Sequence, residues 1–163
     1  MFNSPGITTK KLISMSATTF NRLDNPLPSE EPGRVKKLLF VCIENSNRSQ
    51  MSQAFAKIHG GQNVEAYSAG SKPSGIVNPK AIAAMKELAY DLSAHDSKSL
   101  DEVKEFAPFD VVVTMGCGDA CPWMPAKKFV DWVIPDPKHM ELAGFNQVRD
   151  FIEQKVKELL KEL

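Results

Sequence analysis

Short apolar runs alternate with helical spacing of apolar residues from residue 36 to the end of the chain. Continuous apolar runs bounded by polar residues or glycine indicate buried strands. Four such runs predict strands over residues 38–41, 64–70, 109–115 and 129–134. Alternation of strands with helices favours an α/β fold, here a single-domain four-stranded parallel sheet flanked by helices.

The first two predicted helices follow the first two strands. Helical spacing of apolar residues begins at Met51 and stops at Gly60, because glycine often ends a helix. Asn78 before Pro79 is typical of a helix cap followed by a first-turn proline. Apolar positions over residues 81–89 then predict one buried helix face.

One further helix is predicted before the third strand, and another after the fourth strand. Ser99 and Glu102 form a capping-box signature for a short helix. The C-terminal helix carries its apolar residues on one stripe: Phe145, Val148, Ile152, Val156, Leu159 and Leu163.

Residues 1–35 show no sustained period and contain Ser, Thr, Asn and Pro, which indicates a flexible leader before a catalytic domain over 36–163. Up to Leu23 the leader is basic and lacks acidic residues, a weak likeness to a transit peptide. Translation from Met15 is an equal alternative. We expect no catalytic role for the leader.

Charge and cysteine content narrow the function classes. The chain has 20 Lys plus Arg and 20 Asp plus Glu, so a nucleic-acid or polybasic membrane partner is not expected. No apolar stretch approaches the length that spans a bilayer. Three cysteines without a secretory signal favour thiol chemistry in a reducing compartment over a disulfide framework. We therefore expect a cytoplasmic monomer.

A polar octapeptide joins the first predicted strand to the first helix. It comprises Cys42, Ile43, Glu44, Asn45, Ser46, Asn47, Arg48 and Ser49. Such a turn leaves backbone N–H groups free at the positive end of the helix dipole, where an anion is favoured. A loop that curls around the anion also turns its amides inward. The sequence therefore predicts an oxyanion-binding loop.

The side chains of this loop suit nucleophilic attack on a tetrahedral oxyanion. Arg48 can donate two parallel hydrogen bonds to the anion. The positive end of the helix dipole and Arg48 also favour the nucleophilic thiolate form of Cys42, to which Ser49 can donate a hydrogen bond. Asn45 tolerates a left-handed backbone in a tight loop. The alternative is a buried strand-end cysteine beside an unrelated surface arginine; the strand–loop–helix context favours the site.

Cys117 and Cys121 follow the third predicted strand. Ligands of open parallel sheets bind at the carboxyl ends of the strands, where both Cys42 and Cys117 fall. A lone cysteine pair lacks the further ligands of a tetrahedral zinc site, so we expect no metal and no cofactor. Of the three scattered histidines, His59 is most simply a favourable charge at a helix C-terminus.

Together these segments resemble the thiol-dependent arsenate reductases built on the low-molecular-weight tyrosine phosphatase fold. The likeness runs from about Lys37 to the C-terminus. It rests on the octapeptide with Gln50-Met51, then on residues 67–70, 77–82, 112–115, Cys117, Cys121-Pro122, Trp132 and Asp136-Pro137. The resemblance implies a four-stranded parallel sheet flanked by helices.

The resemblance also implies residue roles. Cys42 is the nucleophile, Arg48 the oxyanion clamp and Asp136 the general acid. Cys117 and Cys121 match two redox cysteines that pass a disulfide outward by thiol–disulfide exchange. Thioredoxin is the implied reductant, and glutathione with glutaredoxin or another low-molecular-weight thiol is the alternative.

Simpler interpretations stay open for these residues. Cys117 and Cys121 can be buried small hydrophobes, although glycines flank Cys117 and the surroundings are polar. The flanking glycines would let the backbone move during a relay, because a disulfide needs Cα atoms within roughly 7 Å. Without the resemblance, Asp136 before Pro137 is better explained as a turn residue.

The chain departs from the family pattern in the loop and at a potassium site found in some reductases. Glu44 stands where the family usually has glycine, and a carboxylate there repels an oxyanion unless it points outward. Asn47 replaces a frequent cysteine. The positions of the potassium ligands are Asn45, Gln53, Ser68 and Lys98. Since two acidic residues have become neutral or basic, we expect no potassium dependence.

Two other functions compete with arsenate reduction. Cys42, Arg48 and Asp136 would equally serve a phosphatase acting on phosphotyrosine or a small phosphoester. Against it, Lys138 and His139 follow Asp136-Pro137 where phosphatases often have tyrosines, and a phosphatase does not require the downstream cysteines. The third possibility is a non-enzymatic oxyanion or redox sensor, which would bind without turnover.

Overall fold

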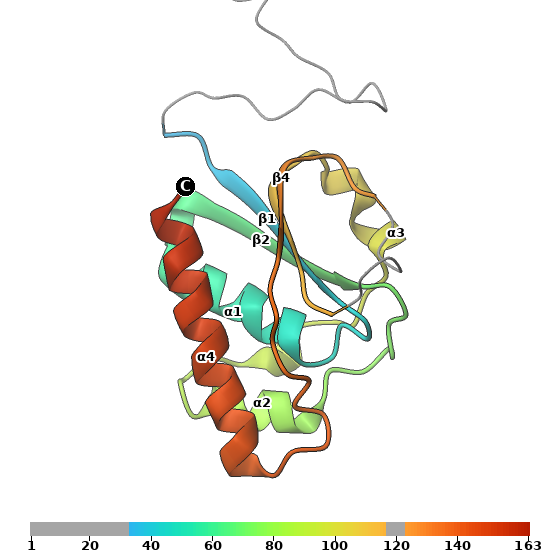
Figure 1. The fold of residues 1–163 in the computed structure, drawn as a ribbon, viewed down its shortest axis with the longest axis vertical. Helices are drawn as coiled ribbons and strands as arrows, with labels where there is room; N and C mark the ends of the chain where they lie inside the picture. Colours follow the sequence, from blue (N-terminus) through green and yellow to red (C-terminus); the bar gives the residue numbers. More distant parts are fainter. Residues whose placement is uncertain (1–32, 117–122) are drawn as a thin grey trace, which may run out of the picture.

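Four parallel strands form one sheet at the centre of the protein (Figure 1). The structure, a computed structural model, describes residues 33–116 and 123–163. In chain order the strands are β1 (Lys36–Cys42), β2 (Val64–Gly70), β3 (Phe109–Thr114) and β4 (Ala126–Asp131). They lie in the order β2-β1-β3-β4, which confirms the predicted four-stranded parallel sheet.

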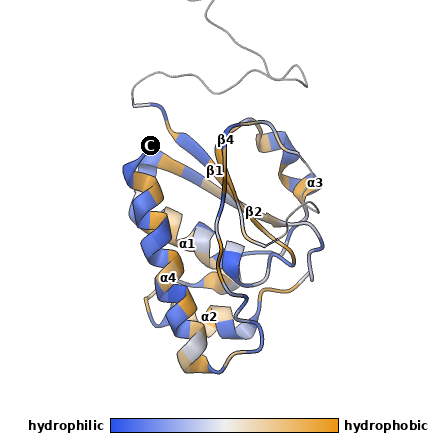
Figure 2. Ribbon diagram, viewed as in Figure 1, coloured by the Kyte–Doolittle hydropathy of each residue, from blue (hydrophilic) through white to orange (hydrophobic). Residues whose placement is uncertain are grey.

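Helices cover both faces of this sheet (Figure 1). The α-helices are α1 (Arg48–Gly60), α2 (Pro79–Lys86), α3 (Leu100–Val103) and α4 (Leu142–Lys161). Short 3₁₀ turns are η2 (Gly61–Asn63), η3 (Leu92–Ala94) and η4 (Lys104–Phe106). The long helix α4 shows alternating apolar and polar bands in Figure 2, as expected of a helix with one buried stripe.

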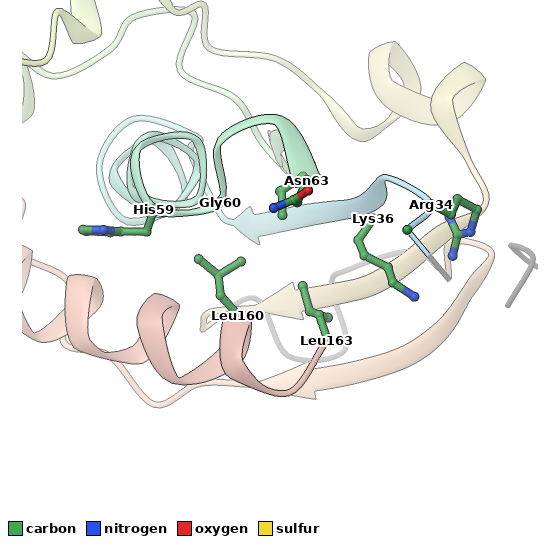
Figure 3. Close-up of a pocket in the computed structure, with 9 residues that line it drawn as sticks. Arg34, Lys36, His59, Gly60, Asn63, Leu160 and Leu163 are labelled. Carbon is green, nitrogen blue, oxygen red and sulfur yellow. The ribbon is translucent and has the colours of Figure 1, made fainter. Parts of the chain in front are cut away.

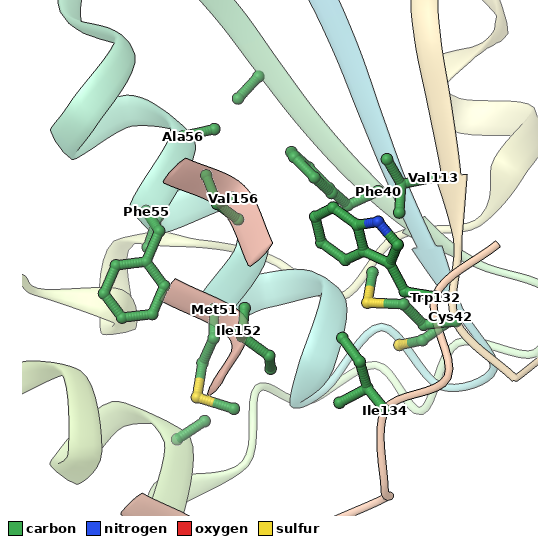
Figure 4. Packing of buried hydrophobic residues seen from close by; sticks show 14 of the residues in the cluster. Phe40, Cys42, Met51, Phe55, Ala56, Val113, Trp132, Ile134, Ile152 and Val156 are labelled. Carbon is green, nitrogen blue, oxygen red and sulfur yellow. The ribbon is translucent and has the colours of Figure 1, made fainter. Parts of the chain in front are cut away.

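The apolar run of β1 supplies two hydrophobic clusters. Leu38 and Phe40 belong to the larger cluster with residues of α1, α2 and α4. Leu39 and Val41 belong to the smaller cluster with residues of α3. Successive strand side chains point to opposite faces, so a continuous apolar run is what a strand covered on both faces requires. Cys42 lies in the larger cluster, where Phe40 and Trp132 pack with ring centroids 6.0 Å apart (Figure 4).

Several helix ends are determined by the local signals in the sequence. Asn78 accepts a hydrogen bond from the Lys80 amide at 2.9 Å, with Pro79 in the first turn of α2. Both halves of the capping box between Ser99 and Glu102 are present at α3. These contacts confirm the predicted helix starts.

Three predicted boundaries were wrong. The fourth strand covers 126–131 rather than 129–134, because its pairing with β3 ends where Thr114 lies opposite Asp131. Helix α2 stops at Lys86, since Ala89 takes a left-handed φ of 62° and turns the backbone. Leu163 lies beyond α4 and is exposed. In each case the apolar pattern continues past the point where the backbone geometry changes.

The topology places one crevice at the carboxyl ends of β1 and β3. The chain leaves β1 through α1 to β2 on one side, whereas β3 lies on the other side of β1. The reversal of strand order between β1 and β3 is the place where open α/β sheets bind ligands. Cys42 ends β1 and Gly116 follows β3, so both lie at this switch point.

Candidate active site

The loop between β1 and α1 is held from outside by the segment that follows β2. Backbone N–H groups of residues 71, 72 and 74 donate to the carbonyl oxygens of Cys42, Ile43 and Glu44 at 3.2, 2.8 and 3.0 Å. These bonds occupy the loop carbonyls on the side away from the cavity. Asn45 has a φ of 50°, which confirms the expected left-handed residue. The loop is therefore shaped by contacts distant in sequence.

Gly70 at the end of β2 allows the close approach of this loop. A Cβ at Gly70 would lie 2.5 Å from the Ile43 carbonyl oxygen and 2.9 Å from the Asn45 amide nitrogen. No side chain fits at these distances without displacing the loop backbone. The sequence contains this glycine, but only the packing of β2 against the loop shows its purpose.

A small cavity lies in front of the loop. Its volume is about 50 Å³, and it is lined by Cys42, Ile43, Glu44, Ser46, Asn47, Arg48 and Asp136. Sites for organic molecules usually measure roughly 300–1,000 Å³, so this cavity suits a small ion. The fold thus brings Asp136 to the octapeptide, where the family resemblance implied that it would lie. The two remaining loop residues, Asn45 and Ser49, are fully buried behind the cavity.

The hydroxyl of Ser49 lies within hydrogen-bonding distance of the sulfur of Cys42. Its Oγ lies 2.9 Å from Cys42 Sγ. The side-chain nitrogen of Asn45, Nδ2, donates to the same Oγ at 2.8 Å, so the serine oxygen already acts as an acceptor there. The hydroxyl hydrogen is then available to Cys42, whose charged form gains most from a donor.

The polar chain continues behind Asn45 to residues that sequence reasoning missed. Gln50 Nε2 donates to Asn45 Oδ1 at 2.9 Å, and its Oε1 lies 2.9 Å from His95 Nδ1. The hydroxyl of Tyr90 lies 2.7 Å from His95 Nε2. Burial lowers the pKa of His95 to about 4, so at neutral pH the ring is uncharged and donates from Nδ1 to Gln50. No motif or regular spacing in the sequence indicates that these residues contact one another.

Replacing Ser49 with alanine is expected to make Cys42 about 10- to 100-fold less reactive toward iodoacetamide at pH 7. The reason is that a hydrogen bond to a charged group is worth about 1.5–3 kcal/mol. Alkylation of the Cys42 peptide would be followed by mass spectrometry across pH. The matched control is Ser52→Ala, because the Ser52 hydroxyl donates to the Arg48 carbonyl oxygen at 2.8 Å and makes no hydrogen bond to Cys42 Sγ. An unchanged Cys42 rate in Ser49→Ala would contradict the role of Ser49.

Arg48 is buried and held on both sides of its guanidinium. Nη1 donates to the Ile134 carbonyl oxygen at 3.1 Å, and Nη2 lies 3.7 Å from Asp136 Oδ2. Gly116 has a φ of 82°, and a Cβ there would lie 2.9 Å from Arg48 Nη1. Glycine at 116 therefore makes room for the guanidinium, a purpose that the sequence did not indicate.

The predicted redox cysteines, Cys117 and Cys121, lie outside the residues that the structure describes. The described chain approaches them as far as Gly116, beside Arg48. Their roles stay predictions.

Asp136 and Glu44 are the two carboxylate residues among the described residues that line the cavity. Asp136 is 48% exposed and accepts a hydrogen bond from the Lys138 amide at 3.1 Å. Its carboxyl group is therefore open to solvent at the cavity that Cys42 also lines, and its role as general acid stays a prediction. Glu44 is paired, because Lys138 Nζ contacts its carboxylate at 2.8 Å.

A larger cavity of about 310 Å³ lies at the opposite end of the sheet (Figure 3). Its lining includes Lys36 and Val64, the first residues of β1 and β2, together with Leu160 and Leu163. No cysteine or carboxylate side chain is among the described residues that line it. His59, also at this cavity, pairs with Glu153 of α4 at 2.8 Å, a partner not evident in the sequence. The nucleophile therefore belongs to the smaller cavity.

Comparison with known proteins identifies the family of this chain. Residues 37–163 match the family of low molecular weight phosphotyrosine protein phosphatases. The chain belongs to this family. The match agrees with the sheet order and with the loop at the end of β1.

Similar members of the family are named as arsenate reductases. The glutaredoxin arsenate reductase of Synechocystis sp. is 37% identical over 134 residues, 79% of this chain and 99% of the relative. Arsenate reductase 2 of Staphylococcus saprophyticus is 42% identical over 127 residues, 76% of this chain and 95% of the relative. The solved structure of an arsenate reductase in the phosphate binding state has a TM-score of 0.72 and 36% identity, covering 78% of this chain and 98% of that one. These findings confirm the family and fold predicted from the sequence.

The four positions matched to a potassium site are bonded to one another or to the backbone. Ser68 Oγ donates to Gln53 Oε1 at 2.6 Å. Asn45 Oδ1 accepts from the Lys98 amide at 2.7 Å, and Lys98 Nζ donates to the Asp96 carbonyl oxygen at 2.8 Å. Over residues 33–116 and 123–163, no cluster of three His, Cys, Asp or Glu side chains could hold a metal ion.

Turnover is therefore expected to be equal in sodium and potassium buffers of the same ionic strength. Gln53 Oε1 and Asn45 Oδ1 already accept internal hydrogen bonds, from Ser68 Oγ and from the Lys98 backbone amide. Initial rates in the two chlorides, with choline chloride as a control for ionic strength, would test this. A marked gain in potassium alone would contradict it.

Among the described segments, none of the helices has the length and apolar character needed to cross a membrane.

Proposed function

We propose that this protein reduces arsenate to arsenite with electrons from thiols. The observation that carries the proposal is the small cavity in which Cys42, Arg48 and Asp136 meet. A cavity of about 50 Å³ lined by a cysteine whose sulfur lies 2.9 Å from a serine hydroxyl suits a small tetrahedral oxyanion. The names of the relatives support arsenate as that oxyanion.

In the first step, the Cys42 thiolate attacks the arsenic atom of arsenate held by the loop amides and Arg48. Arg48 and the N-terminal end of α1 stabilise the negative charge on the anion. Asp136 donates a proton to the departing oxygen, which leaves as water. The product is a Cys42 sulfur–arsenic(V) adduct.

In the second step, the Cys117 thiolate attacks Cys42 Sγ. The sulfur–arsenic bond breaks and its electron pair stays on arsenic, so arsenic(V) becomes arsenite while a Cys42–Cys117 disulfide forms. Cys121 then attacks Cys117, which releases the Cys42 thiolate and leaves a Cys117–Cys121 disulfide. A reducing dithiol supplies two electrons and closes the cycle.

Thioredoxin is the reductant that we propose first, with glutathione and glutaredoxin as the second candidate. The first is what the resemblance of Cys117 and Cys121 to the family's redox cysteines implies. The name of the Synechocystis relative supports the second. Both reductants reach the same disulfide, so the cavity itself does not distinguish them.

The test supplies arsenate to the purified full-length protein with a thioredoxin system and, separately, with glutathione, glutaredoxin and glutathione reductase. Arsenite and NADPH oxidation would be measured together, and one arsenite per NADPH is expected in at least one system. Cys42→Ser is the inactive control. Hydrolysis of p-nitrophenyl phosphate without arsenite formation would favour the phosphatase. Oxyanion binding without either reaction would favour the sensor.

A further inference from the structure

Glu44 introduces a negative charge into a loop built for anions. The residue lines the cavity together with Cys42 and Arg48. Its backbone is fixed from behind, because the Glu44 carbonyl oxygen accepts from the Ser74 amide and from Ser97 Oγ, both at 3.0 Å. The side chain is partly exposed at the cavity's rim. Left unpaired, this carboxylate would repel an incoming oxyanion.

Lys138 reaches Glu44 from the segment that carries Asp136. Lys138 Nζ lies 2.8 Å from Glu44 Oε2, and the hydrogen bond to Glu44 is the main reason why the pKa of Lys138 is raised. The Lys138 amide also donates to Asp136 Oδ1 at 3.1 Å. One residue therefore contacts the carboxylate of the loop through its side chain and the candidate acid through its backbone.

The pair is the third of three links between the loop and residues 134–138. The other two come from Arg48, which donates to the Ile134 carbonyl oxygen and lies 3.7 Å from Asp136. Arg48 is buried, whereas Glu44 and Lys138 are 35% and 44% exposed. Because Glu44 lines the cavity and is partly exposed, the ion pair lies at one edge of the cavity, nearer to solvent than Arg48.

We propose that Glu44 and Lys138 form a specificity pair that cancels the loop's extra negative charge and closes one side of the cavity to organic substituents. The proposal rests on the proposed function, because it assigns to this cavity a small inorganic oxyanion. It also explains how a carboxylate is tolerated in the loop: it is neutralised by a lysine from a segment distant in sequence.

Removing the lysine alone should harm binding more than removing both charges. In Lys138→Gln the Glu44 carboxylate faces the oxyanion without compensation, and about tenfold weaker phosphate binding is expected from a like charge near the surface. In the double variant Glu44→Gln/Lys138→Gln the repulsion disappears with the compensation, so binding returns to the wild-type value. An exposed ion pair contributes little to folding, so all variants should stay folded.

The experiment is a double-mutant cycle read out on binding. Inorganic phosphate is the probe, and its dissociation constant is obtained from protection of Cys42 against iodoacetamide in the full chain. Wild type, Glu44→Gln, Lys138→Gln and the double variant are compared. Lys128→Gln is the matched control, because Lys128 also pairs with a glutamate, Glu162 at 4.0 Å, and neither member of that pair lines the cavity, whereas Glu44 does.

Phosphate binding as weak in the double variant as in Lys138→Gln would overturn the proposal, since the Glu44 carboxylate would then not be the source of the repulsion. No weakening in either background would overturn it as well. Closure is tested separately: the double variant should bind phenyl phosphate better relative to phosphate than wild type does, and an unchanged ratio would refute that part. Because these assays measure binding, failure of arsenate turnover would not affect their outcome.

Discussion

Cys117→Ser is expected to abolish arsenite formation while leaving phosphate binding at Cys42 unchanged. Reduction requires that the sulfur–arsenic bond breaks with its electron pair on arsenic, and this happens only when a second thiolate attacks Cys42 Sγ. Serine has no such nucleophile at neutral pH. In the proposed function, oxyanion binding uses the loop and Arg48, which line the cavity. Arsenite would be measured beside phosphate protection of Cys42.

Cys121→Ser is the informative partner of this variant. It retains the thiol that releases arsenite but lacks the one that regenerates Cys42, so it should form one arsenite per protein molecule and accumulate a Cys42–Cys117 disulfide. Peptide mapping without reductant would detect that disulfide. Full multiple turnover in Cys117→Ser would instead show that an external thiol attacks the Cys42 adduct directly, and the internal relay would be wrong.

Arg48→Lys is expected to lower kcat/KM for arsenate by about 10- to 100-fold. Each charge-assisted hydrogen bond contributes about 1.5–3 kcal/mol, and a guanidinium can give two parallel ones to an oxyanion where an ammonium gives a single point contact. Arg48 also donates to the Ile134 carbonyl oxygen at 3.1 Å. A lysine cannot serve the anion and this carbonyl with the same planar geometry. Steady-state kinetics and phosphate protection of Cys42 would measure both consequences.

The control for Arg48→Lys is a second buried arginine. Arg149 is 7% exposed and donates to the Ala84 carbonyl oxygen at 2.9 Å, between α4 and α2 and away from the cavity. Arg149→Lys should reduce thermal stability with little change in kcat/KM. Similar losses of activity in both variants would indicate that damage to the packing, and not loss of the clamp, explains the result.

Local signals in the sequence were sufficient for most elements of the fold. The apolar run at 38–41 required a strand covered on both faces, and the capping box of Ser99 and Glu102 marked α3 because both of its hydrogen bonds are made within four residues. The end of β4 was not predictable in this way. That end depends on where the backbone pairing with β3 stops, and the residues of β4 contain no local signal for it.

The same division holds for the site. Cys42, Arg48 and Ser49 are separated by a few residues on a strand-to-helix turn, so their spacing alone indicated an anion and a thiolate. His95 and Gln50 are 45 positions apart and meet only because the chain after α2 returns to the start of α1. Residues joined by a long connection carry no shared pattern, and so the polar chain behind Cys42 escaped prediction.

The sequence by itself determined the parallel sheet, the strand-to-helix loop that begins at Cys42 and the family resemblance, because strand runs, caps and a turn motif are encoded over short distances. Only the tertiary structure decided how Glu44 is accommodated and why Gly70 and Gly116 are glycines. Glu44 lies 94 positions from the lysine that pairs with it, and each glycine is required by atoms of a separate segment that approach within 3 Å. Such contacts depend on the position of the whole fold around the loop, which no local pattern contains.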